Sequence, residues 1–249
     1  MKSVVCIKRV PDTEARIRIK DDKSAIDAAG IKFVISPYDE FAIEAAISFK
    51  DVNGTGEVVV LSVGDASAAE QLRSALARGA DRAVLLKGEP TMDGLATARA
   101  LAAEIKPLNT DVILFGMKAV DDDQQQVGPM VAELLGLPCV TVVAEFEIEN
   151  DKAICHREVE GGIEVVETPL PAVIAITKGK YEPRYPSLKG IMAAKKKPLE
   201  EKPAQLGNTR VQLRDLSYPP ERPPGKIVGT GVDAVPELVR VLREEAKVL

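Results

Sequence analysis

The sequence predicts an α/β fold with a doubly wound, mostly parallel sheet, a β-hairpin extension and a long C-terminal arm. Short apolar runs alternate with helical patterns through residue 135, an order typical of right-handed βαβ units whose sheet is covered on both faces. After Pro138, apolar and polar residues alternate around turn signals, which indicates hairpins. A proline-rich stretch with little periodic apolar content then leads to one final helical pattern.

The first half of the chain contains the predicted βαβ units. A buried strand is expected over 2–9, and a helix over 37–50 opens with acidic residues, which favour the positive end of the helix dipole. The helix expected over 66–78 is followed by Gly79, a residue suited to the position just after a helix. The other elements expected here are strands 57–63, 82–86 and 111–115 and helices 92–105 and 124–135.

The second half is expected to differ in character. Hairpin strands are expected at 140–148, 153–159 and 163–167, and one more apolar strand at 171–177. Residues 179–231 are expected to be disordered or wrapped around another molecule. Because an amphipathic helix pattern returns over 232–249, the arm is expected to be held at both ends, most simply by a partner subunit. We therefore divide the chain into an α/β domain (1–180), a basic loop (181–198) and an arm with its helix (199–249).

Composition excludes several classes of function. A net charge of −5 argues against a general nucleic-acid binder. The three cysteines have no C-x-x-C spacing, so neither a zinc site nor a disulfide scaffold is predicted. The single histidine, His156, is expected on a hairpin strand, so hydrolytic and metal-dependent catalysis are disfavoured. With no signal peptide and no apolar run of membrane-spanning length, we expect a cytoplasmic protein that is not membrane-embedded.

The basic loop has an unusual composition. It reads Y-E-P-R-Y-P-S-L-K-G-I-M-A-A-K-K-K-P and places Leu188 between prolines and the cations Arg184, Lys189 and Lys195–Lys197. An apolar side chain held out among cations suits docking onto an acidic partner with a small apolar hole. The alternatives are an ordinary core leucine and a solvated lysine run.

A second segment, Gly116–Gly128, follows an apolar strand and opens a helix. In α/β sheets, ligands bind at the carboxyl ends of the strands. Gly116 permits close backbone approach, and Asp121–Asp123 are expected to cap the helix, which leaves amides near Gln125, Gln126 and Val127 for an anion. The carboxylates must then point away from a phosphate as caps, or meet the ribose hydroxyls and Lys118. A solvated acidic helix start and a Mg²⁺ site are the alternatives, and the sequence contains neither a Walker motif nor G-x-G-x-x-G.

Taken together, these segments resemble the small (beta) subunit of electron transfer flavoproteins. The resemblance covers nearly the whole chain and includes V-C-I-K-R-V-P-D-T, S-P-Y-D-E-F-A-I-E-A-A, R-S-A-L-A-R-G-A-D-R-A, the Gly116–Gly128 segment and the basic loop. It implies a Rossmann-like sheet of the adenine-nucleotide-binding type. It also implies a heterodimer with an alpha subunit that passes electrons from flavin dehydrogenases, of the acyl-CoA dehydrogenase type, to a quinone oxidoreductase. The protein would be an electron carrier, with no bond-making chemistry of its own.

In that family the redox-active FAD is held mainly by the alpha subunit, and the beta subunit binds a structural AMP. Carried over to this chain, the resemblance implies a cofactor-binding set comprising Cys6, Ser36, Pro37, Tyr38, Asp39, Val63, Gly116, Met117, Lys118, Ala119, Val120, Asp121, Asp122, Asp123, Gln124, Gln125, Gln126 and Val127. Tyr38 would lie near the flavin ring. Val127 stands where the family often has threonine, and Thr13 where some relatives have tyrosine.

The resemblance also implies which residues bind partners. Leu188 matches the anchor of the family's recognition loop, and Glu158 matches an acidic residue that pairs with an arginine of the mobile flavin domain. The implied partner-binding set comprises Glu158, Arg184, Tyr185, Leu188, Lys189, Ile191 and Met192.

Two alternative functions stay open. A bifurcating subgroup of the family binds a second FAD in place of AMP and tends to read D-G-D-T-A-Q where this chain reads D-D-D-Q-Q-Q over 121–126. Asp122 in place of the glycine favours AMP, because the glycine would give room for the larger dinucleotide. The other alternative is a stand-alone adenine-nucleotide-binding protein. Such a protein could hydrolyse or sense the nucleotide, or it could be a scaffold that binds the nucleotide only for its own stability.

Overall fold

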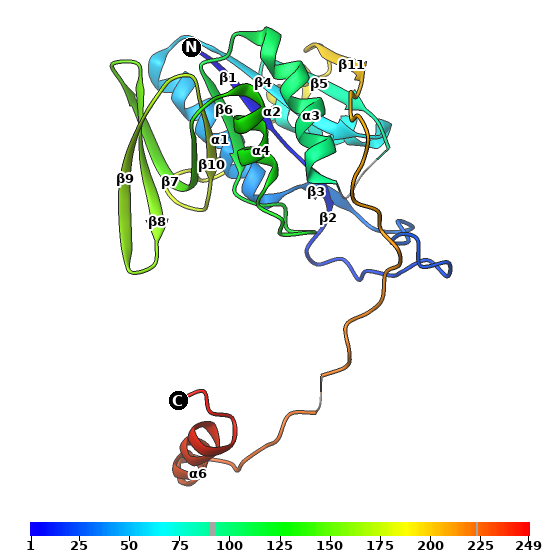
Figure 1. Cartoon of the computed structure of the whole chain (residues 1–249), viewed down its shortest axis with the longest axis vertical. Coiled ribbons are helices and arrows are strands. Elements are labelled where there is room, and N and C mark those ends of the chain that lie inside the picture. Colours follow the sequence, from blue (N-terminus) through cyan, green and yellow to red (C-terminus); the bar gives the residue numbers. More distant parts are fainter. Residues whose placement is uncertain (90–92, 223) are drawn as a thin grey trace. The chain divides into compact units, whose positions relative to one another are not determined.

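The computed structural model describes residues 1–89, 93–222 and 224–249. Contacts divide the chain into two compact units, Met1–Asp215 and Leu216–Leu249. The first unit contains a nine-stranded sheet in the order β11-β5-β4-β1-β6-β10-β7-β8-β9 and a two-stranded antiparallel ribbon, β2-β3 (Figure 1). The predicted α/β class with a doubly wound, mostly parallel sheet is confirmed.

Parallel pairing runs from β11 to β7, and only the outer hairpins are antiparallel. The strands of this sheet are β1 (Lys2–Cys6), β4 (Glu57–Gly64), β5 (Arg82–Lys87), β6 (Val112–Gly116), β7 (Cys139–Glu149), β8 (Lys152–Val159), β9 (Gly162–Pro169), β10 (Ala172–Ile176) and β11 (Leu199–Pro203). The ribbon consists of β2 (Arg9–Pro11) and β3 (Phe33–Ile35).

The helices cover both faces of the sheet, as Figure 1 shows. They are α1 (Pro37–Asn53), α2 (Ala69–Arg78), α3 (Gly94–Ile105), α4 (Val127–Leu135) and α5 (Leu188–Ala194), and the second unit contains α6 (Val235–Arg240). Alternation along β4 shows why two layers form. Val58 and Val60 pack with α1 and α2, whereas Val59 and Leu61 face the cluster that includes residues of α3 and α4. Apolar area is thereby buried on both faces, the main source of stability for such a sheet.

Four elements differ from the sequence-based expectation. Helix α4 begins at Val127 and not at Gln124, because Asp123 and Gln125 have positive φ angles of 51° and 54°, which no α-helix contains. Strand β11 and helix α5 lie within 179–231, the range expected to be disordered or wrapped around another molecule, and both pack within the first unit. The helix expected over 232–249 is split into a 3₁₀ turn (Val232–Ala234), α6 and a π turn (Val241–Glu245).

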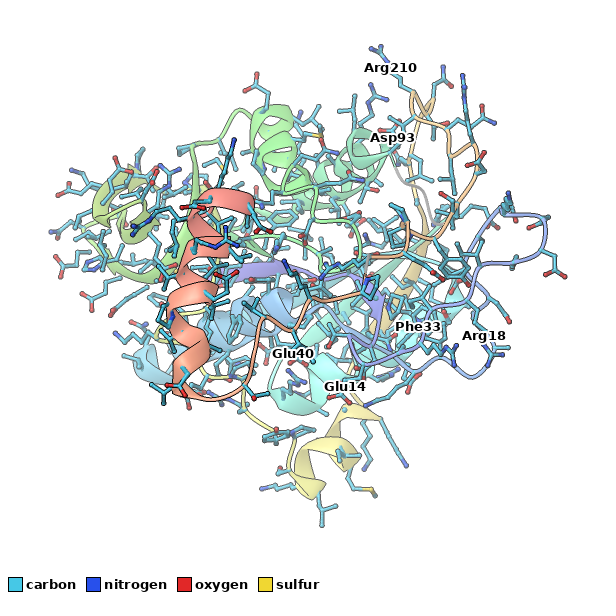
Figure 2. All side chains as sticks on the ribbon, turned by 90° about the horizontal axis from the view of Figure 1, so that it is seen from below. Glu14, Arg18, Phe33, Glu40, Asp93 and Arg210 are labelled. Carbon is cyan, nitrogen blue, oxygen red and sulfur yellow. The ribbon has the colours of Figure 1, made fainter. Side chains whose placement is uncertain are left out.

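Beyond β11, the chain as far as Val211 is hydrogen-bonded to the rest of the first unit. Asp93 is buried and caps α3 by accepting hydrogen bonds from the amides of Leu95 and Ala96, at 3.0 and 3.2 Å. Its other oxygen accepts the amide of Arg210 at 2.6 Å, and Figure 2 shows these two residues close together. The predicted start of this helix at Met92 lies outside the described residues. In the part of the chain that the structure describes, no helix is both long and apolar enough to cross a membrane.

Candidate functional site

The predicted nucleotide-binding residues lie at the carboxyl-terminal ends of the neighbouring parallel strands β4, β1 and β6. We call this end of the sheet the nucleotide-binding edge. Strand β1 lies between β4 and β6, so the strand order reverses at β1 and β6. Cys6, the last residue of β1, is in register with Phe115, the residue before Gly116 at the end of β6. A reversal of this kind is where ligands bind in open α/β sheets.

Asp39 joins the three segments that meet at this edge. Its side chain lies in the first turn of α1 and is 6% exposed. One carboxylate oxygen accepts the amide of Lys8 at 2.7 Å, and the other accepts the amide of Gly116 at 3.0 Å. Burial raises the pKa of Asp39 to about 7, although the two amide hydrogen bonds act in the opposite direction. The start of α1 is therefore fixed to the ends of β1 and β6.

Gly116 is required by this close contact. A Cβ atom there would lie 2.5 Å from Asp39 Oδ1 and 2.6 Å from both Asp39 N and the carbonyl carbon of Tyr38. No side chain fits in that space, so Gly116 allows the close packing of α1 on the end of β6; close approach of its backbone to a ligand stays a prediction.

Two lysines form ion pairs with the three adjacent carboxylates of the Gly116–Gly128 segment. Lys8 Nζ lies 2.8 Å from Asp121 Oδ2 and 2.7 Å from Asp122 Oδ2. Burial alone would lower the pKa of Lys8, but its hydrogen bonds to the two carboxylates raise it, so the ammonium stays charged. Lys118 Nζ lies 2.8 Å from Asp123 Oδ2.

The expectation that these carboxylates cap α4 is wrong. The N-cap of α4 is Gln126, and no side chain makes a capping hydrogen bond there. The carboxylates bind lysines instead, because the positive φ of Asp123 and Gln125 turns the chain before the helix starts. The other expected arrangement, in which a carboxylate meets Lys118, is confirmed. Among the described residues, no group of three acidic, histidine or cysteine side chains could hold a metal ion.

The start of α4 supplies backbone donors. The first amides of an α-helix have no partner within the helix and carry a partial positive charge, which suits an anion. Gln126 fixes this end of the segment, since its side-chain amide donates to the Gln124 side chain and packs on Gly94 of α3. A Cβ at Gly94 would lie 2.7 Å from Gln126 Nε2.

The start of α1 forms the opposite wall. Ser36 is fully buried, its amide donates to the Lys8 carbonyl at 2.9 Å, and its hydroxyl lies 3.5 Å from the Lys118 carbonyl. The Tyr38 ring contacts Phe41 edge-on and lies 5.8 Å from Lys118 Nζ. Tyr38 thus packs between α1 and the Gly116–Gly128 segment, where it is half-buried.

The remaining predicted cofactor-binding residues lie on the same edge. Cys6 is buried, and its burial raises the pKa of the thiol well above the usual value, so it is an apolar contact and not a nucleophile. Val63 lies near the end of β4. Pro37 is at the start of α1, and Met117, Ala119 and Val120 are half-buried in the segment after β6. The predicted set does not include Lys8, a cation two residues after the end of β1 that pairs with Asp121 and Asp122.

A cavity of about 530 Å³ lies apart from this edge, within residues 12–32 between β2 and β3. Its lining includes Glu14 and Arg18, which Figure 2 labels, together with Asp27 and Lys32. Charges of both signs line it, so it favours neither an anionic nor a cationic ligand.

The second predicted site, the basic loop, is a turn followed by the short helix α5. Ser187 caps this helix by accepting the amide of Gly190 at 3.0 Å, and Leu188 is its first residue. Leu188 is 85% exposed, so the alternative of an ordinary core leucine is wrong. The exposed apolar residues here are Tyr185, Leu188, Ile191 and Met192.

Two of the cations expected around Leu188 have other partners. Arg184 forms ion pairs with Glu44 and Asp51, both at 2.8 Å. Lys197 Nζ donates to the carbonyl of Leu76 at 3.0 Å, so it is not part of a solvated lysine run. Lys189, Lys195 and Lys196 are exposed.

Glu158 lies apart from the basic loop. It is exposed near the end of β8, close to one end of the sheet order, whereas α5 packs on α2 beside β4 and β5. His156 lies on the same strand, as predicted.

Comparisons with known proteins find relatives over nearly the whole chain. The electron transfer flavoprotein domain model matches residues 24–206. The chain is 45% identical over 238 residues to the electron transfer flavoprotein subunit beta of Syntrophomonas wolfei, covering 96% of this chain and 92% of that protein. It is 40% identical to the Bacillus subtilis subunit beta, with complete coverage of both chains, and 36% identical to that of Pongo abelii, with 98% coverage of each.

Proposed function

This chain belongs to the beta subunits of the electron transfer flavoprotein family, and we propose that it binds AMP and docks flavin dehydrogenases. In this proposal the AMP has a structural role. The FAD that exchanges electrons is held mainly by the alpha subunit, which passes them to a quinone oxidoreductase. A beta subunit implies an alpha subunit as partner; the cofactors, the dehydrogenases and the acceptor are part of the proposal.

The observation that carries the AMP proposal is the convergence at Asp39. Its two backbone hydrogen bonds bring the start of α1 and the ends of β1 and β6 to one edge of the sheet. Lys8 and Lys118 pair with all three aspartates, so their two positive charges offset most of the negative charge of this segment. The adjacent amides at the start of α4 can then donate hydrogen bonds to a phosphate, because the lysines draw the carboxylates into ion pairs.

The residues of this chain would have binding roles only. The amides at the start of α4 would hold the phosphate, the chain near Ser36 and Tyr38 would form one wall, and Val63 with Cys6 would supply apolar contacts. Bound at this edge, the nucleotide would stabilise the segments that it joins. FAD, when bound in the complex, supplies the one- and two-electron chemistry.

Docking is proposed to use Leu188 and its exposed apolar neighbours. An apolar side chain that is 85% exposed gains free energy when a partner buries it, and nearby lysines raise the rate of encounter with an acidic surface. Glu158 is proposed to pair with an arginine of the flavin domain, at its separate place on β8.

Ligand release tests the cofactor assignment. The chain is purified with its alpha subunit and denatured, and the released nucleotides are quantified by mass spectrometry. One AMP and one FAD per heterodimer are expected. Two FAD without AMP would overturn the AMP assignment in favour of the bifurcating class. Recovery of the chain without flavin or partner would instead indicate a stand-alone nucleotide-binding protein.

A further inference from the structure

The basic loop is fixed at its N-terminal end by Arg184, a residue that the family resemblance places among those that bind partners. Arg184 Nε lies 2.9 Å from Glu44 Oε2 and its NH2 group 2.8 Å from Glu44 Oε1. The Arg184 amide also donates to Glu44 Oε2, at 3.1 Å. A third interaction joins the guanidinium to Asp51 at 2.8 Å. The backbone and side chain of one residue are therefore both bound to helix α1.

Glu44 is placed to hold this contact. Its side chain is 8% exposed, so the carboxylate depends on its partners for compensation. Burial alone would raise the pKa of Glu44, but the hydrogen bonds from Arg184 and Ser48 lower it. A paired arginine–carboxylate fork of this kind restricts both distance and angle, which a lysine cannot do.

The C-terminal end of α5 is fixed by a second arginine. Arg73 of α2 donates to the carbonyls of Ala194 and Lys197, both at 2.7 Å. Between the two ends, Gly190 lies directly against α2, where a Cβ would be 2.3 Å from the Ala77 carbonyl oxygen. Helix α5 is thus held at both ends and in the middle, while Leu188 and Met192 stay exposed.

We propose that Arg184 is a positioning residue, whose ion pair with Glu44 fixes residues 185–192 in one conformation before a dehydrogenase binds. This rests on the docking function proposed above, but it assigns Arg184 a role inside the chain and removes it from the contact surface. A segment that is ordered in the free protein loses less conformational entropy on docking, so a single exposed leucine can act as an effective anchor.

The variants Arg184→Lys, Arg184→Met and Glu44→Gln test this inference. Arg157→Lys is the matched control, because Arg157 is as exposed as Arg184, at 37%, and forms a single ion pair with Glu164 in the hairpin. Each variant is purified with its alpha subunit. The first readout is hydrogen–deuterium exchange of residues 185–192 without any dehydrogenase. The Ile191 amide is a direct reporter, since it donates to the Ser187 carbonyl at 2.9 Å.

We expect exchange in this segment to rise roughly tenfold or more for Arg184→Met, less for Arg184→Lys, and not at all for the control. Arg184→Lys keeps a positive charge beside Glu44 and should leave the fold intact. Its melting temperature, compared with that of the unmodified protein, shows whether unfolding explains any rise in exchange. Unchanged exchange in both arginine variants would overturn the inference.

Kinetics supply the second readout, with a substrate-reduced acyl-CoA dehydrogenase as donor. If residues 185–192 are ordered in only a fraction of the molecules, the KM for the carrier rises by about the inverse of that fraction. The kcat at saturation should change less than about twofold. A lower kcat with an unchanged KM would contradict a positioning role. An unchanged KM for Leu188→Ala would instead refute docking by this leucine, whatever the exchange shows.

Discussion

Replacing Gly116 with alanine should disturb the predicted nucleotide-binding edge more than a methyl group added at any other position there. The added Cβ would lie 2.5 Å from Asp39 Oδ1, about 0.9 Å inside the 3.4 Å at which ordinary contact begins. Two more neighbours, Asp39 N and the Tyr38 carbonyl carbon, are backbone atoms at 2.6 Å that no rotamer change can move. The start of α1 must therefore shift, and the hydrogen bond from Gly116 N to Asp39 is lost or lengthened.

The expected cost follows from this geometry. Overpacking of a closely packed site typically costs about 1–3 kcal/mol, and loss of a hydrogen bond to a buried carboxylate adds to it. For a chain of this size, each kcal/mol corresponds to roughly 2–4 °C in melting temperature. With about 1 kcal/mol for the lost hydrogen bond, the total cost is about 2–4 kcal/mol. We therefore expect Gly116→Ala to melt about 4–16 °C below the unmodified protein, with weaker retention of AMP.

Gly128→Ala is the matched control, twelve residues later in the same segment. Its Cβ would lie 3.4 Å or more from the Phe115 ring, an ordinary contact, and alanine is the better residue inside a helix. Melting is followed by circular dichroism on the complex with the alpha subunit, with bound nucleotide measured in parallel. If both variants melt within about 2 °C of the unmodified protein, the close packing of Gly116 on α1 is wrong.

Three further predictions concern charge and docking. Burial raises the pKa of Asp39 from 3.8 to about 7, so its contribution to stability is complete below pH 3.8 and is lost as the pH rises toward 7. Between pH 5 and 6.5 the free energy of unfolding should fall by about 1.4 kcal/mol per pH unit. Asp39→Asn should remove that slope in melting curves, and a slope that persists in this variant would refute the prediction. Lys8→Met should weaken AMP binding roughly tenfold by calorimetry, because two carboxylates lose their counter-ion; the same change at the exposed Lys152 is the control, and equal affinities would contradict the argument. Leu188→Ala should raise the KM for a dehydrogenase by about 10- to 100-fold, the equivalent of 1.5–3 kcal/mol of burial, while Val52→Ala, whose side chain is equally exposed in helix α1, should have little effect.

Local sequence patterns predicted the sheet because its strands are encoded locally. Strands such as β1, β4 and β10 are continuous apolar runs bounded by turn residues, and their burial follows from composition alone. Strand β11 could not be found in this way. Its sequence, Leu199-Glu200-Glu201-Lys202-Pro203, has one large apolar residue, and it forms because β5 offers an edge to pair with. Charged residues are common on such edge strands, where one side faces water.

The site was predicted as a set of positions but not as a network of contacts. The resemblance named Asp39 and Gly116 as cofactor-binding residues, and the structure shows that they bind each other. Lys8 pairs with Asp121 across 113 residues of sequence, and Arg184 pairs with Glu44 across 140. No local pattern encodes such pairs, since a lysine after a strand or an arginine in a basic loop has the same sequence context whether it is solvated or paired.

The pairing of the cations changes how both surfaces should work. If Lys8 and Lys118 were free, they would attract a phosphate directly, but both are already bound to aspartates. The attraction for an anion must then come mainly from backbone amides, whose direction is fixed by the turn that precedes α4. At the basic loop, Arg184 is likewise bound to helix α1, so Lys189, Lys195 and Lys196 are the cations left to attract an acidic partner. In each place some charges shape the backbone, and other groups meet the ligand or partner.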